Sequence, residues 1–160
     1  MEMTNLTKIL EVLKNADIQW LMSVGIEINV NTGETVIKEG SYIENIYIVL
    51  EGELGVYLSS SGGKKISTVG VGEIVGEMSY LEDKITTASV VAQENSVLIA
   101  IPRELLDVKV EEESAFGKRL YKGLAISLSQ RLRSILEHMD YILKMLDKAK
   151  DWSDKTNSKA

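Results

Sequence analysis

Gly76, Glu77 and Ser79 bring a glycine, an acid and a small residue together at the start of a short helical segment. A helix start of this kind presents free backbone N–H groups and the positive end of the helix dipole, which can bind an anion. A carboxylate beside those amides suits the hydroxyl groups of a sugar. The pattern therefore favours a site for a phosphorylated sugar, although an acid here can also stabilise a helix N-terminus without any ligand.

Other kinds of side-chain chemistry find little support in the sequence. The chain has one histidine, His138, and no cysteine, so neither a metal site of several imidazoles nor a thiolate nucleophile can be assembled. Ser60, Ser61 and Ser79 lie outside any G-x-S-x-G context, and Gly62-Gly63-Lys64 lacks the remaining spacing of a phosphate-binding loop. We therefore expect a protein that is not an enzyme and that holds no metal and no cofactor.

The charge balance argues against nucleic acid as a direct partner. The 160 residues carry 24 acidic against 18 basic side chains, which gives a formal net charge of -6. Such a chain is poorly suited to neutralising the phosphates of a duplex. No run of about 18 apolar residues occurs, so we expect no membrane segment. The lack of cysteine fits a cytoplasmic location.

Strand-like runs precede and follow the candidate site. After two predicted helices over residues 4–14 and 16–24, such runs recur at 26–30, 35–37, 45–50, 54–58 and 65–69, separated by glycine-containing turns. A helical insertion is expected at 74–81, before further strand composition at 87–92 and 96–101. Several short strands at even spacing predict a sandwich or barrel rather than βαβ units.

A long amphipathic helix is predicted to follow the strands. Pro102 closes the last strand, and from Ser114 onward apolar residues recur every three or four positions as far as Leu146. At about 35 residues this helix is longer than the barrel it leaves, so we expect its apolar stripe to form a homodimer. Arg119, Arg131 and Arg133 are expected on its solvated face.

These patterns divide the chain into four parts. They are an N-terminal helical segment at 1–25, a β-barrel at 26–102, C-terminal helices at 103–150 and a polar tail at 151–160 that we expect to fray.

Three stretches give the chain a resemblance to the cyclic nucleotide-binding domain family. Residues 33–40 resemble its early strand pair, 46–57 its central hairpin and 75–81 its phosphate-binding cassette, which would extend over 75–88. The resemblance implies a mainly β fold with flanking helices: a double-stranded β-helix (jelly-roll) barrel with N-terminal helices and a long C-terminal helix. It also implies a regulatory domain whose ligand is cyclic AMP or cyclic GMP.

The resemblance implies ligand contacts from six cassette residues. They are Gly76, Glu77, Met78, Ser79, Thr86 and Thr87. Glu77 would accept a hydrogen bond from the ribose 2′-hydroxyl, and Thr87 would donate one to a phosphate oxygen. Gly76 and Ser79 would let the backbone lie close to the sugar and the phosphate.

Thr86 departs from the family pattern, which usually has at this position an arginine that pairs with the cyclic phosphate. A charge-assisted contact contributes about 1.5–3 kcal/mol, so its loss would weaken binding by about one to two orders of magnitude. Lys84 could compensate only as a point charge.

Two hypotheses therefore remain. One is a sensor with weakened or altered nucleotide binding, and the other is a ligand-free, degenerate domain that acts as a dimerisation or partner-docking scaffold. Relatives similar to the catabolite activator add a helix-turn-helix after the long helix. Since only a short polar tail follows here, we expect the output to lie on another partner.

Overall fold

The computed structural model describes residues 8–157 of the chain. The chain divides into two compact units, Met1–Ser127 and Leu128–Ala160. Every strand of the described residues lies in the first unit, and the described part of the second unit is one helix. The candidate site therefore belongs to the first unit.

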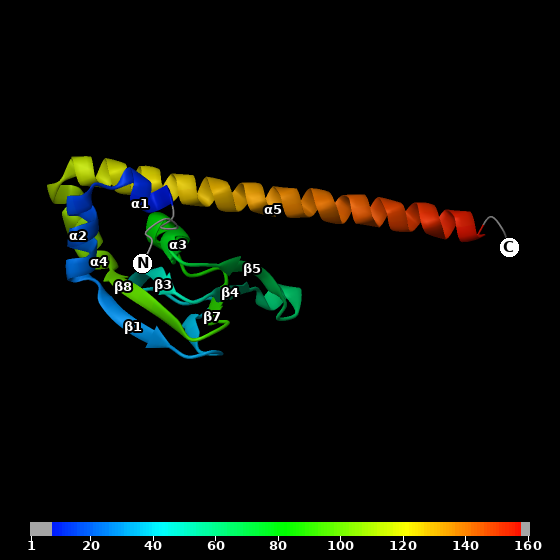
Figure 1. Cartoon of the computed structure of the whole chain (residues 1–160), viewed down its shortest axis with the longest axis horizontal. Helices are drawn as coiled ribbons and strands as arrows, with labels where there is room; N and C mark the ends of the chain where they lie inside the picture. Colours follow the sequence, from blue (N-terminus) through cyan, green and yellow to red (C-terminus); the bar gives the residue numbers. More distant parts are fainter. Residues whose placement is uncertain (1–7, 158–160) are drawn as a thin grey trace. The chain divides into compact units, whose positions relative to one another are not determined.

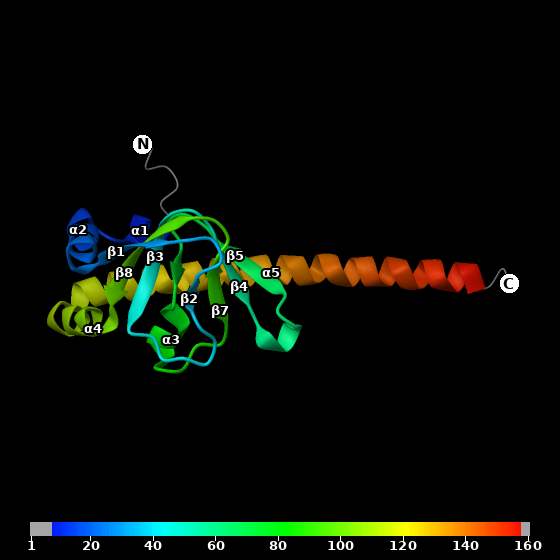
Figure 2. The same cartoon turned by 90° about the horizontal axis from the view of Figure 1, so that it is seen from below.

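The strands form two four-stranded sheets, ordered β1-β8-β3-β6 and β2-β7-β4-β5 (Figures 1 and 2). Their bounds are β1 (Ile26–Val30), β2 (Thr35–Ile37), β3 (Asn45–Glu51), β4 (Leu54–Tyr57), β5 (Lys65–Val69), β6 (Ile74–Val75), β7 (Ser89–Ala92) and β8 (Ser96–Pro102). All pairs are antiparallel, and partners far apart in sequence meet: Ile26 of β1 lies opposite Ala100 of β8. Two facing sheets with such non-local neighbours form a jelly roll, which confirms the predicted fold class.

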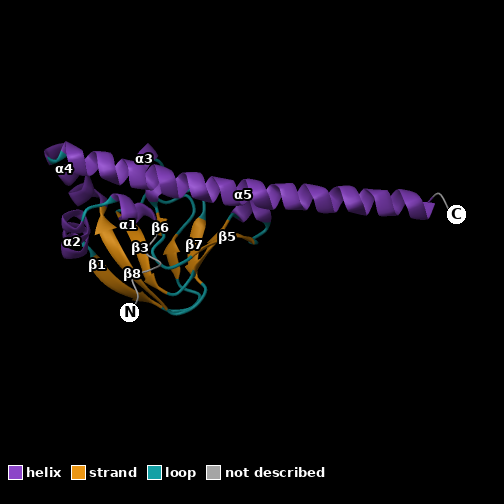
Figure 3. Cartoon of the chain, turned by 45° about the horizontal axis from the view of Figure 1, so that its top comes forward, coloured by secondary structure: helices purple, strands orange, loops and turns teal. Residues whose placement is uncertain are grey.

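The helices are α1 (Lys8–Val12), α2 (Asn15–Val24), α3 (Glu77–Glu82), α4 (Arg103–Glu112) and α5 (Ser114–Asn157), with a short 3₁₀ turn at Ser59–Ser61. Those of the first unit, including α5 as far as Ser127, flank the sheets (Figure 3). Residues 4–7 of the first predicted helix lie outside the described residues. Both α2 and α4 contact β8, the strand at the middle of the first sheet.

The structure corrects the sequence prediction at the start of the cassette helix and at the end of α5, and several other boundaries differ by one or two residues. Ile74 and Val75 were expected to be helical, but they form β6 and pair with Ile48 and Tyr47 of β3. Both side chains are buried, and a strand lets a pair of consecutive β-branched residues fill the space beside β3. At the other end α5 continues to Asn157, past residue 150 where the predicted helical region ends.

The core of the first unit lies between the sheets and extends under the helices. Leu54, Leu98, Leu106, Phe116 and Leu124 are each 0% exposed. The last three come from α4 and the first part of α5, so this part of α5 is a component of the core. Burial of each such side chain contributes about 1.5–3 kcal/mol, which fixes the start of α5 against the barrel.

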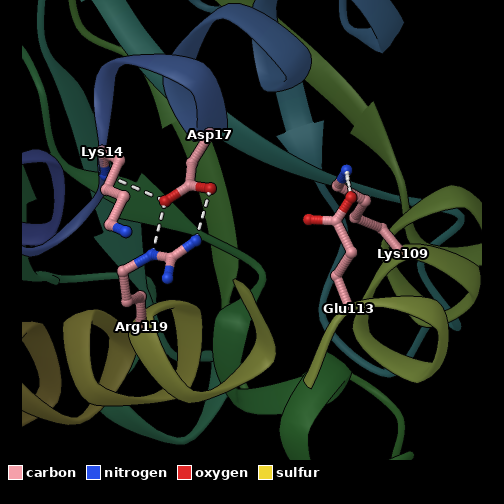
Figure 4. A network of polar contacts seen from close by, with 5 residues as sticks. All are labelled: Lys14, Asp17, Lys109, Glu113 and Arg119. Carbon is pink, nitrogen blue, oxygen red and sulfur yellow. Dashed lines mark hydrogen bonds and ion pairs between the residues drawn. The ribbon is translucent and has the colours of Figure 1, made fainter. Parts of the chain in front are cut away.

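An ion pair also holds the start of α5 to α2 (Figure 4). Arg119 donates from Nε and from a terminal nitrogen to the two carboxylate oxygens of Asp17, at 2.7 and 2.8 Å. Asp17 is 4% exposed and also accepts the backbone N–H of Lys14, just before α2. The expectation that Arg119 lies on a solvated face is therefore wrong. Its partner comes from a residue 102 positions away, which helix periodicity cannot reveal.

Candidate functional site

Gly76 sets the geometry of the cassette, because it lies in the left-handed backbone region between β6 and α3. Its φ is 89° and its ψ is -4°. A Cβ atom at this position would lie 2.9 Å from Ile43 Cδ1 and 3.4 Å from the carbonyl oxygen of Asn45. Both the backbone angle and the close packing require glycine here. The chain can therefore turn sharply from β6 into α3.

Glu77, the first residue of α3, is buried. Its exposed fraction is 1%, and that of Ser79 is 6%. A carboxylate at this depth needs polar partners, since burying a charge is otherwise costly. Met78, between them, is 47% exposed. The start of α3 thus presents one apolar side chain outward while the acid and the serine lie inside.

Thr86 is buried at the other end of the cassette and joins it to the loop after β2. Its hydroxyl donates to the carbonyl oxygen of Lys38 and accepts the backbone N–H of Ser41. Its own backbone N–H donates to the Ser41 carbonyl, and its carbonyl accepts the N–H of Gly40. Four hydrogen bonds thus come from the residue that stands in place of the family's arginine. They give this threonine a structural role whether or not it meets a ligand.

The structure brings the predicted site residues together in two groups. Gly76, Glu77, Met78 and Ser79 follow one another at the start of α3, and Thr86 and Thr87 lie in the segment before β7. Thr87 is exposed, in contrast to Thr86. Contact between these six residues and a ligand stays a prediction.

The cassette helix contacts α4, a contact that the sequence patterns did not predict. Arg103, the first residue of α4, pairs with Asp83 at the C-terminal cap of α3, with 2.7 Å between a terminal nitrogen and Oδ1. Its guanidinium also lies 6.0 Å from the centre of the Tyr80 ring. No local sequence pattern around Arg103 pointed to α3.

Tyr80 is the buried part of this contact. The side chain is 6% exposed, and no hydrogen bond of good geometry reaches its hydroxyl from the described residues. Burial raises the pKa of Tyr80, and the nearby Asp107 carboxylate and Tyr121 hydroxyl add to the effect. Asp107 belongs to α4 and Tyr121 to α5. The cassette helix therefore packs beside residues of both C-terminal helices within the first unit.

Two other features are absent from residues 8–157. No group of three or more metal-ligating side chains is gathered there, and no helix there has the length and apolar character to cross a membrane.

A family model described as "Cyclic nucleotide-binding domain" matches residues 27–113, which include the whole cassette. Among curated proteins, the chain is 30% identical over 112 residues to "Lysophospholipase nte1" of Aspergillus fumigatus, covering 69% of this chain and 7% of that protein. It is 32% identical over 80 residues to "cGMP-dependent protein kinase" of Plasmodium berghei, covering 50% and 9%. The chain thus spans less than a tenth of these relatives.

Solved structures share the fold at lower identity. A cyclic nucleotide-binding domain from Methylobacillus flagellatus superposes with a TM-score of 0.74 at 23% identity, covering 82% of this chain and 80% of that one. The Catabolite Activator Protein of Thermus thermophilus superposes with a TM-score of 0.69 at 24% identity, covering 85% and 63%. At this identity the likeness supports the fold.

Proposed function

Because the chain belongs to the cyclic nucleotide-binding domain family, we propose that it is a non-enzymatic regulatory domain that binds cyclic AMP or cyclic GMP at its cassette. The observation that carries the proposal is the position of Glu77. Its carboxylate is 1% exposed at the first residue of α3, directly after Gly76, whose left-handed backbone conformation favours glycine. In this role Glu77 accepts from the ribose 2′-hydroxyl, and the amides at the start of α3 face the phosphate. Met78 offers an apolar surface to the sugar or the base.

The contact between α3 and α4 supports a route by which occupancy is reported. A ligand that shifts α3 changes the position of Asp83 and Tyr80, which contact Arg103. Because α4 leads directly into α5, a change at the cassette is transmitted to the start of α5. A ligand shifts such an equilibrium only by its difference in affinity for the two arrangements.

Two further elements belong to the proposal. The domain forms a homodimer through α5, and its output lies on a partner rather than on DNA bound by this chain. It acts in the cytoplasm, where an intracellular cyclic nucleotide would reach it.

Thermal unfolding with and without cyclic AMP, cyclic GMP and cyclic dinucleotides tests the binding proposal. A ligand at about a hundred times its dissociation constant adds about 2.7 kcal/mol to the free energy of unfolding. Glu77→Gln keeps the shape of the side chain and removes its charge, so we expect about tenfold weaker binding. Glu82→Gln is the matched control, because Glu82 lies on the same helix and is exposed in an ion pair with Lys84. Equal affinity in both variants would contradict the role of Glu77.

The internal hydrogen bonds of Thr86 favour a second candidate, a ligand-free scaffold. On this reading the cassette keeps its shape through Thr86 and binds no nucleotide. Thr86→Arg restores the family's charge but removes the threonine hydroxyl from its two partners. Thr87→Arg adds a guanidinium at an exposed neighbouring position and leaves those bonds intact. No thermal shift for the natural chain, with a clear shift for either variant, would favour the scaffold.

A further inference from the structure

The second unit exposes an unusually wide apolar helix face. Its described residues form the C-terminal part of α5, and Leu132, Leu136, Met139 and Leu143 are 56%, 55%, 52% and 57% exposed. Ile135, Ile142 and Leu146 are 45%, 45% and 53% exposed. A single helix cannot bury its own stripe, and a patch of this kind marks an interaction surface.

The spacing of these residues indicates what covers them. Apolar residues follow steps of four and three without interruption, at Leu128, Leu132, Ile135, Met139, Ile142 and Leu146. This is a heptad repeat, with Leu132, Met139 and Leu146 at positions a and with Leu128, Ile135 and Ile142 at positions d. An apolar stripe with a period of 3.5 residues packs along its whole length only against helices with the same period, in a left-handed supercoil. A second copy of α5 has the same period and can therefore cover the stripe.

The residue types indicate how many copies. Leucine at two of the three a positions and isoleucine at two of the three d positions shift the preference from two strands to three or four. Of these numbers, four is the one that a pair of the proposed dimers gives. Position e carries Leu136 and Leu143, where two-stranded coiled coils generally have charged residues. The apolar face therefore spans a, d and e, which is wider than the seam between two helices.

Charged residues lie beside this face, at position b next to e, and opposite to it, at position f. Arg133, Asp140 and Asp147 stand at position b, and Asp140 pairs with Lys144 at position f, with 2.6 Å between Oδ2 and Nζ. A helix so divided is solvated along one side, while its a, d and e side chains are available to other helices.

We infer that four copies of this chain associate through residues 128–149 of α5, as a pair of the proposed dimers. The a and d residues form the centre of the bundle, and Leu136 and Leu143 pack between neighbouring helices. This assembly goes beyond the proposed function and does not depend on nucleotide binding.

Light scattering on the full chain after size-exclusion chromatography, over a dilution series, tests the inference. We expect a mass four times the chain mass of 17.7 kDa. Leu136→Glu with Leu143→Glu should reduce the assembly to dimers, because these substitutions place charge at e and leave the a and d seam intact. Leu132→Glu with Met139→Glu should give monomers.

Ser134→Glu with Tyr141→Glu is the matched control. It adds the same two charges, also seven residues apart, at position c, and it removes a side chain that is 60% exposed. It should leave the mass at four chains, and circular dichroism at 222 nm checks that each variant folds. A natural chain that is a dimer overturns the inference but keeps the proposed dimer. If the natural protein is a monomer, both the tetramer and the proposed dimer are overturned. Nucleotide binding is measured separately, so neither result decides the proposed ligand site. A tetramer that persists in the Leu136 and Leu143 variant overturns the role of position e.

Discussion

We predict how much the ion pair between Asp17 and Arg119 contributes to the free energy of unfolding by joining the start of α5 to α2. Arg119→Met keeps the aliphatic part of the side chain and removes the guanidinium. The Asp17 carboxylate is 4% exposed, and in this variant it keeps the hydrogen bond from the backbone N–H of Lys14 but loses both hydrogen bonds from Arg119. Removing one partner of a fully buried pair costs about 3–5 kcal/mol. Because the Arg119 side chain is 22% exposed, we expect a loss of about 2–4 kcal/mol.

A double-mutant cycle with Asp17→Asn isolates the pairwise energy. We expect a coupling of about 1.5–3 kcal/mol at pH 7, since two charge-assisted hydrogen bonds are lost together. The hydrogen bonds from Arg119 hold the pKa of Asp17 below the ordinary value of 3.8 for an aspartate. A lowered folded-state pKa gives stability that is present above the unfolded value and is lost as pH falls through the folded value. The coupling should therefore vanish at pH well below 3.8.

Urea unfolding followed by tryptophan fluorescence measures this cycle. Trp20 of α2 stacks edge-to-face on Phe116 of α5, with 5.4 Å between ring centres, so its emission reports the same junction. Trp152 is 73% exposed and should be replaced by phenylalanine in every variant. All measurements use one protein concentration, because association of α5 would add to stability. A coupling below about 0.5 kcal/mol at pH 7, or one unchanged in acid, would refute the reasoning.

Two further predictions concern the cassette. Gly76→Ala should destabilise the fold by about 2–4 kcal/mol, because it combines left-handed backbone strain with a close contact to Ile43. Gly33→Ala, at φ 86° with nothing within 4 Å of the added Cβ, should cost only about 1–2 kcal/mol in the same urea assay, and equal losses would contradict the packing argument. Tyr80→Phe should leave stability unchanged or raise it by about 1 kcal/mol, because the buried hydroxyl lacks a well-formed hydrogen bond. Since the pKa of Tyr80 is raised, the free energy of unfolding of the natural protein should fall as pH rises above 10.0, and the Tyr80→Phe variant should lose part of this pH dependence. If Tyr80→Phe instead lowers the free energy of unfolding by about 1–2 kcal/mol at pH 7, the hydroxyl makes a stabilising hydrogen bond to Asp107.

The sequence by itself determined the elements of the barrel. Alternation of apolar and polar residues is a local property, so strands such as β1 and β5 were predicted at Ile26–Val30 and Lys65–Val69, where they occur. It also determined the heptad pattern of α5, because the spacing along one helix is visible without its neighbours. The family resemblance rested on the same local signals, together with their order.

The tertiary structure decided which distant residues meet. Thr86 looked like a lost ligand contact, but its hydroxyl joins the cassette to Lys38 and Ser41, some 45 residues away. Arg119 looked solvated until the fold brought Asp17 beside it. Ile74 and Val75 became a strand because β3 offers them hydrogen-bond partners that an isolated segment lacks. In each case the deciding energy comes from a partner far along the chain, and such a partner is fixed only when the two sheets have formed.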